Sequence, residues 1–354
     1  MDASLINQFR DKANQHQLIL HIYRNCNGKN KWSIICSAMD WIQIGVFGSD
    51  ATILEKTNSD QASVKVITFL CCIDVLWEGI QQLHRVLFDT DDIPFKDSRD
   101  IFHKAMDDNH YWKEIRAAFA AHPCNLKGAD RGERQFASWS GGGFGSSGDF
   151  SVILYSNDPN KSSEFFDIRF DEIIAFAKSR YEYLNDLMNR MDEIIKQWCE
   201  KWRRIPIEQS GSALDDIHVL MKANAERLDN DYYKYRLEEI EKVFFVEVHG
   251  KRNRKVLDEY RETLKAEVEV IHQVLQEMNL DYEPEDTDFE DLNYNYQNQQ
   301  IFEPGKGMIS WAADSLKMPL GQYIDLDLWE TIEELQVLVN AGWWFKHEAE
   351  KELS

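Results

Sequence analysis

The chain contains few residues that interrupt regular backbone: among its 354 residues there are only seven prolines and seventeen glycines. Because these two residue types end helices and strands, their scarcity favours long regular elements. No apolar stretch has the length of a membrane span, and the N-terminal Met1-Asp2-Ala3-Ser4 lacks the basic start and apolar run of a signal peptide. These absences predict a cytoplasmic protein with no membrane segment.

Several chemistries are excluded because their motifs are missing. The six cysteines stand without the two-residue spacing of a zinc knuckle or a redox pair. No helix carries a paired-histidine metal motif, no Gly-x-Ser-x-Gly elbow offers a nucleophile, and no dinucleotide fingerprint follows a strand. The glycine-rich stretch 141–148 lacks the lysine of a phosphate-binding loop. We therefore expect neither a metal nor a cofactor.

The charge of the chain is strongly one-sided, with 62 acidic and 40 basic residues and a formal net charge of −22. Affinity for long nucleic acid depends on lysine and arginine side chains that neutralise phosphates, so the surface as a whole is unsuited to it. A small positive cleft on an acidic body, a narrow structured RNA or a basic partner protein stays compatible with this charge.

Apolar residues recur at helical spacing through the first 123 residues. They predict four helices, near 3–25, 31–47, 61–88 and 98–122, which together make an up-and-down bundle. Eleven tryptophans, nineteen phenylalanines and thirteen tyrosines predict a core of high aromatic content. The fold class expected is mainly α.

The pattern changes after residue 123. Two short runs rich in aromatic and β-branched residues, 134–140 and 149–156, flank the glycines and predict a β-hairpin insertion over 134–157. A heptad rhythm then predicts one long helix over 165–202. Further helices are expected near 212–242, 253–279 and 326–350.

These elements divide the chain into four segments. The first, 1–205, combines the bundle, the hairpin and the long helix, and a helical extension follows over 206–280. Residues 281–304 form an acidic and polar linker, because they concentrate carboxylates and asparagines with little to pack. A C-terminal helical segment occupies 305–354.

One short string carries candidate chemistry, residues 114–123 with the sequence EIRAAFAAHP. Pro123 cannot continue a helix and pushes the preceding residue toward extended geometry, so His122 lies where the chain can turn back toward Arg116. The guanidinium of Arg116 offers a planar fork of donors to phosphate oxygens, and His122 can exchange a proton near neutral pH. Together they could hold and cleave one phosphodiester.

An arginine followed after five residues by a histidine at a helix end resembles the signature of the HEPN superfamily (higher eukaryotes and prokaryotes nucleotide-binding). The resemblance covers at most the first half of the chain, and Ala117 stands where many active members carry a polar residue. It implies a helical homodimer whose two motifs meet in one cleft and cleave RNA without a metal, with Arg116 and His122 as catalytic residues. Asn125 and Lys127, just after the motif, are the expected substrate-binding residues.

In that interpretation the chain is a toxin or an antiviral-defence protein, whose partners are RNA, a second copy and an inhibitor or activator protein. Two alternatives stay open. A helical stripe of apolar residues includes His122, so this histidine could instead be satisfied inside the core of a non-catalytic interaction protein. A nucleotide-sensing domain could use Arg116 for phosphate alone. Asp74 and Glu78, on the flank of the helix over 61–88, could orient a histidine or arginine or form exposed ion pairs.

Overall fold

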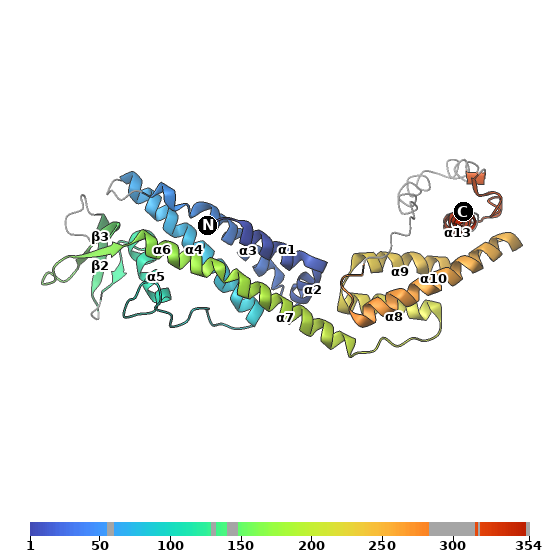
Figure 1. The fold of residues 1–354 in the computed structure, drawn as a ribbon, viewed down its shortest axis with the longest axis horizontal. Coiled ribbons are helices and arrows are strands. Elements are labelled where there is room, and N and C mark those ends of the chain that lie inside the picture. Colours follow the sequence, from blue (N-terminus) through green and yellow to red (C-terminus); the bar gives the residue numbers. More distant parts are fainter. Residues whose placement is uncertain (55–59, 129–131, 140–147, 283–315, 318, 352–354) are drawn as a thin grey trace. The chain divides into compact units, whose positions relative to one another are not determined.

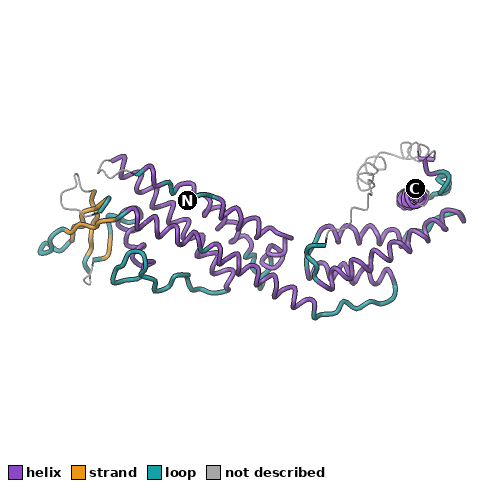
Figure 2. Tube along the Cα trace, viewed as in Figure 1, coloured by secondary structure: helices purple, strands orange, loops and turns teal. Residues whose placement is uncertain are grey.

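A computed structural model defines the fold for the greater part of the chain (Figure 1). It describes residues 1–54, 60–128, 132–139, 148–282, 316–317 and 319–351. They form two compact units, Met1–Lys196 and Gln197–Ser354. Helices make up most of both units and a small antiparallel sheet lies in the first, which confirms the predicted mainly α class (Figure 2). Within the described ranges, no helix combines the length and apolarity that crossing a membrane requires.

The first unit is built on helices of very different length that share one hydrophobic core. These are α1 (Ser4–Asn14), α2 (Leu18–Arg24), α3 (Trp32–Gly48), α4 (Asp60–Phe88), α5 (Asp108–Arg116), α6 (Phe170–Glu182) and the start of α7 (Leu184–Arg203). The helices predicted over 31–47 and 61–88 are confirmed by α3 and α4. The helix predicted over 3–25 is interrupted between α1 and α2, because His16 and Gln17 adopt positive φ angles of 54° and 52°.

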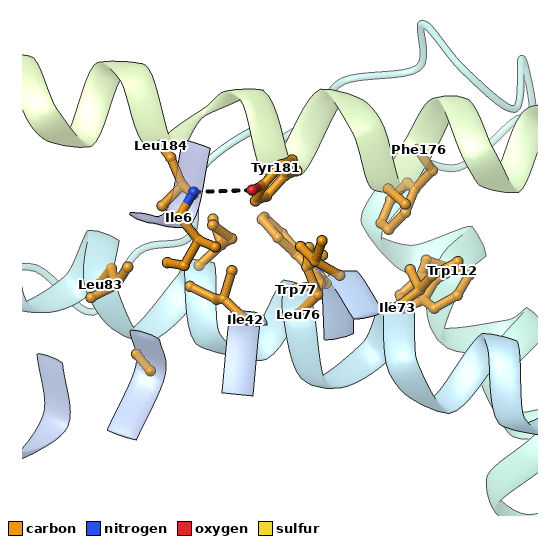
Figure 3. Close-up of a cluster of buried hydrophobic side chains, with 14 of the residues drawn as sticks. Ile6, Ile42, Ile73, Leu76, Trp77, Leu83, Trp112, Phe176, Tyr181 and Leu184 are labelled. Carbon is orange, nitrogen blue, oxygen red and sulfur yellow. Dashed lines mark hydrogen bonds between the residues drawn. The ribbon is translucent and has the colours of Figure 1, made fainter. Parts of the chain in front are cut away.

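Two glycines let α3 and α4 approach closely. A Cβ atom on Gly45 of α3 would lie 2.6 Å from the Cβ of Leu76, and one on Gly79 of α4 would lie 2.6 Å from Cγ1 of Ile42. The core spreads from this seam to α6 and α7, whose Phe176 and Leu184 meet side chains of α4 and of the N-terminal helices (Figure 3). Close packing of this kind makes the bundle intolerant of added volume.

The fourth predicted helix, 98–122, is wrong over its first half. α5 begins only at Asp108, and the segment before it folds around the Asp108 carboxylate, whose side chain is buried. That carboxylate accepts hydrogen bonds from the backbone nitrogens of Ile101 and Phe102 and from Oγ of Ser98. A buried aspartate that bonds local backbone offers the chain an alternative to the helix, and here that alternative is adopted.

The sheet has four strands in the order β1 (Leu126–Lys127), β2 (Arg134–Trp139), β3 (Phe150–Ser156) and β4 (Glu164–Ile168). The β2–β3 pair confirms the predicted hairpin, whose glycine-rich connection at 140–147 lies outside the described residues. The long helix predicted over 165–202 is wrong at its start, because residues 164–168 pair with β3. The remaining helical stretch is α6 and α7, separated at Tyr183.

The second unit contains α8 (Ala213–Arg227), α9 (Asp231–Phe245), α10 (Lys251–Glu277) and α13 (Ile332–Lys351). The single helix predicted over 212–242 is two helices, because the Asn230 side chain caps α9 by accepting from the backbone nitrogens of Tyr232 and Tyr233. The unit boundary lies inside α7, ahead of the boundary predicted at 205. Of the predicted linker over 281–304, only residues 281 and 282 are described. Of the predicted segment 305–354, residues 316–317 and 319–351 are described.

Candidate active site

The backbone changes path between Arg116 and His122. α5 ends at Arg116, and Ala117–Ala121 form a π-helical turn in which the His122 nitrogen donates to the Ala117 carbonyl at 3.0 Å. His122 then leaves the helix at φ −139° and ψ 44°. His122 therefore leaves the α region, as the steric rule for the residue before proline requires, although its ψ lies short of the extended geometry predicted for it. Single π turns are rare in proteins, and those that occur are often found at functional sites.

Arg116 is held by an acid from the neighbouring helix. Its Nη1 donates to Oδ2 of Asp74 on α4 at 2.9 Å, and Nε1 of Trp112 donates to the other carboxylate oxygen at 3.4 Å. The Arg116 side chain stays 39% exposed, and its buried Nε has no hydrogen-bond partner in the described part of the chain. One side of the guanidinium is therefore fixed by Asp74, while the exposed part of the side chain can meet a ligand.

His122 is exposed, and within the described ranges its ring forms no hydrogen bond and no ring contact. The interpretation of His122 as a satisfied core histidine is therefore wrong. The apolar stripe that suggested it continues only to Phe119, which is 1% exposed and packs against Trp139 and Phe166 of the sheet. No direct bond joins the side chains of His122 and Arg116.

The two predicted substrate-binding residues follow His122 along the surface. Asn125 is exposed, and its backbone nitrogen donates to the His122 carbonyl at 3.1 Å. Lys127 is exposed on β1, where it is paired with Arg134 of β2. The loop is tied to the sheet because the Ala137 nitrogen donates to the Pro123 carbonyl at 2.7 Å. The motif and the sheet therefore form one continuous region.

A thiol lies one helical turn before Asp74 on α4. Partial desolvation and the Asp74 charge raise the pKa of the Cys71 thiol above its ordinary value, and the opposing effect of Arg116 is smaller. The thiol form is therefore favoured at neutral pH, whereas nucleophilic chemistry requires the thiolate. Cys71 is not suited to be the nucleophile of this site.

The sequence did not predict that aromatic and basic side chains share the exposed face of the sheet, which we call its outer face. Side chains alternate between the two faces of a strand, so Arg134 and Phe136 of β2 share one face. The register places Tyr155 opposite Phe136, and Lys127 opposite Arg134, on this same face. Phe165 of β4 joins them through its partner Ile153 on β3. The alternation of residues 134–138 was visible in the sequence, but the pairing that assembles the face was not.

Possible ligands of a metal ion do not cluster: within the described ranges, no group of three or more histidine, cysteine, aspartate or glutamate side chains could hold one. Comparison with protein-family models, with curated proteins and with solved structures gives no match for this chain. The resemblance to the HEPN superfamily therefore stays a prediction that depends on residues 114–123.

Proposed function

We propose that this chain is a metal-independent endoribonuclease of the HEPN-like kind, with Arg116 and His122 as its catalytic residues. One observation carries the proposal: an exposed imidazole, without a bonding partner among the described residues, follows by a single π turn an arginine whose guanidinium is held by Asp74. A charged fork of donors and a titratable ring are the two groups that phosphodiester cleavage by proton transfer needs. A toxin or an antiviral-defence protein would use such a site.

The chemistry follows from these two groups. Arg116 binds the non-bridging oxygens of the scissile phosphate and stabilises the charge that develops there. A base removes the proton of the ribose 2′-hydroxyl, the 2′-oxygen attacks phosphorus, and the 5′-oxygen leaves with a proton from an acid. The products are a 2′,3′-cyclic phosphate and a 5′-hydroxyl. His122 supplies one of the two proton transfers, and His122 of a second copy supplies the other.

The proposal is tested by incubating the purified full chain with total cellular RNA in the presence of EDTA. Fragments that end in a cyclic phosphate are the expected result, because no step above uses a metal. RNA that stays intact at every protein concentration contradicts the proposal and favours a non-catalytic interaction protein. Arg116→Ala serves as the negative control, since it removes the phosphate-binding group.

Asp74 acts through Arg116 as a positioning residue. We expect Asp74→Asn to lower kcat roughly 10- to 100-fold, because a misplaced guanidinium loses transition-state contacts, while the pH profile of the reaction keeps its shape. Steady-state kinetics over a range of pH measure both. The matched control is Asp171→Asn, which breaks an exposed ion pair with Arg169 of 3.1 Å. An Asp74→Asn enzyme with unchanged kcat contradicts this role.

Helix α3 offers a surface through which two copies of the chain could associate. Its 17 residues include a single charged side chain, Asp40, and Trp41, Ile44 and Phe47 are 51%, 51% and 68% exposed. Beside them, a hollow of about 580 Å³ runs between α3 and α4. Copies that each carry a net charge of −22 repel one another, so they associate best through a face with few charges and exposed aromatic rings.

Trp41→Glu is therefore expected to convert a dimer into a monomer, because it places a carboxylate at the centre of this face. Sedimentation equilibrium or light scattering measures the mass in solution. Tyr232→Glu is the control, since Tyr232 is 42% exposed on α9 in the other unit. A wild-type chain that is monomeric at every concentration contradicts the dimer.

A further inference from the structure

The outer face of the sheet gathers three aromatic side chains that the fold does not use. Phe136, Tyr155 and Phe165 are 38%, 47% and 46% exposed, and within the described ranges their rings touch no other ring. The inner face is different, because Trp139 and Phe150 of the sheet pack edge-to-face with centroids 5.3 Å apart. Aromatic rings that stabilise this sheet therefore lie on its inner face, and those of the outer face are available to a ligand.

Two cations complete the outer face at the β1–β2 end. Lys127 and Arg134 are exposed, and neither forms an ion pair in the described part of the chain. Lys161, by contrast, is paired with Glu133 at 2.7 Å. The one acid that the register places on this face is Asp167, opposite Ser151, at the far end of β3 from Tyr155. Among the described residues that the strand register places on this face, the β1–β2 end therefore carries two cations and no acid.

We propose that the outer face of the sheet binds an unpaired segment of RNA, with bases stacked on Phe136, Tyr155 and Phe165 and phosphates at Lys127 and Arg134. The inference deepens the proposed function, on which it rests, because it names the class of RNA that the chain would bind. Bases of single-stranded RNA stack on exposed aromatic side chains of sheets, and each has a π-face whatever its identity. The substrate class is therefore single-stranded or looped RNA, recognised with little sequence preference.

The charges favour RNA over a second copy on this face. A contact between identical faces of two copies would offer only one acid, Asp167, to the two cations Lys127 and Arg134, so at least one cation would be buried without a partner. Burying unpaired cations is strongly unfavourable, whereas phosphates neutralise them with release of counterions. The Pro123–Ala137 hydrogen bond joins the loop that carries His122 to β2 at the edge of the sheet.

The test measures binding separately from cleavage, in full-length protein that carries His122→Asn. The probe is a short fluorescein-labelled single-stranded oligoribonucleotide of mixed sequence, followed by fluorescence anisotropy. Adding Phe136→Ala or Phe165→Ala is expected to raise the Kd about tenfold each, and Phe136→Tyr to leave it unchanged. Phe245→Ala is the matched control, because Phe245 is 61% exposed in the other unit. The same sequence as a duplex is expected to bind more weakly.

A second measurement protects the test against a sheet that fails to fold. Lys127→Gln and Arg134→Gln are surface changes, and each is expected to lower the slope of log K against log salt by about one. Unchanged Kd in the Phe136 and Phe165 alanine variants overturns the inference, as does a change of sedimentation coefficient, which would assign the face to a protein contact. If the wild-type chain binds the single strand through this face without cutting it, the proposed nuclease function is wrong and the inferred RNA-binding face is supported.

Discussion

His122→Asn is expected to lower the rate of RNA cleavage by at least about 10²- to 10⁴-fold, because one general acid or base contributes that range and the substitution removes the His122 of both copies. Asparagine keeps a polar side chain of similar size but cannot take up or release a proton near neutral pH. The free energy of unfolding should change by no more than about 0.5 kcal/mol, because the ring is exposed and forms no bond in the described structure. The two readouts together separate a catalytic histidine from a structural one.

The measurement is the cleavage rate in EDTA with urea unfolding of the same preparations. His103→Asn is the matched control, because His103 is another exposed histidine of the same unit and its positive φ of 51° suits asparagine. Arg116→Lys should reduce cleavage as well, since an ammonium lacks the planar fork of the guanidinium. A His122→Asn protein that cuts as fast as wild type would end the assignment of this ring to proton transfer.

The largest effect on stability is expected from Asp108→Ala, a loss of about 3 kcal/mol in the free energy of unfolding. Asp108 is buried, with only 1% of its surface exposed. It accepts from Oγ of Ser98 at 2.9 Å and from the nitrogens of Ile101 and Phe102 at 3.3 and 3.0 Å. Alanine leaves these donors unsatisfied, and each hydrogen bond to a charged group is worth roughly 1.5–3 kcal/mol, with incomplete additivity.

Urea unfolding followed by circular dichroism measures this loss. Asp100→Ala is the control: Asp100 accepts from the same Ser98 hydroxyl at 3.1 Å but is exposed, so water replaces the lost bond and the change should stay near 0.5 kcal/mol. Equal stability of the two variants would show that the segment before α5 is not organised by the Asp108 carboxylate.

The sequence correctly predicted helices that bury one regular stripe of apolar residues. α4 buries Val66, Ile73, Ile80 and Leu87 along one side, and a repeat of this kind can be seen without knowing what covers it. The same rule wrongly predicted helix at 98–107 and at 165–168. In the first case a single buried carboxylate competed with the helix, and in the second a pairing partner on β3 turned apolar residues into a strand.

In the candidate site, too, local features could be predicted and contacts between helices could not. A π turn was not predicted, but the end of the helix before Pro123 was, because that restriction is steric and involves adjacent residues. The contact between Arg116 and Asp74 joins residues of two helices, α5 and α4. From the sequence, Asp74 could be predicted only as an acid able to orient a histidine or arginine. Its actual partner depends on which sides of the two helices face each other, and packing decides that.

The sequence by itself determined the helical class of the protein, the hairpin and the place where the chain leaves the helix at His122. These depend on composition, on periodicity and on proline, all of which act over a few residues. Only the tertiary structure decided that His122 faces solvent while Phe119 is buried, and that Phe136 and Phe165 share a face. Sharing a face depends on strand register, which is set between segments distant in the chain.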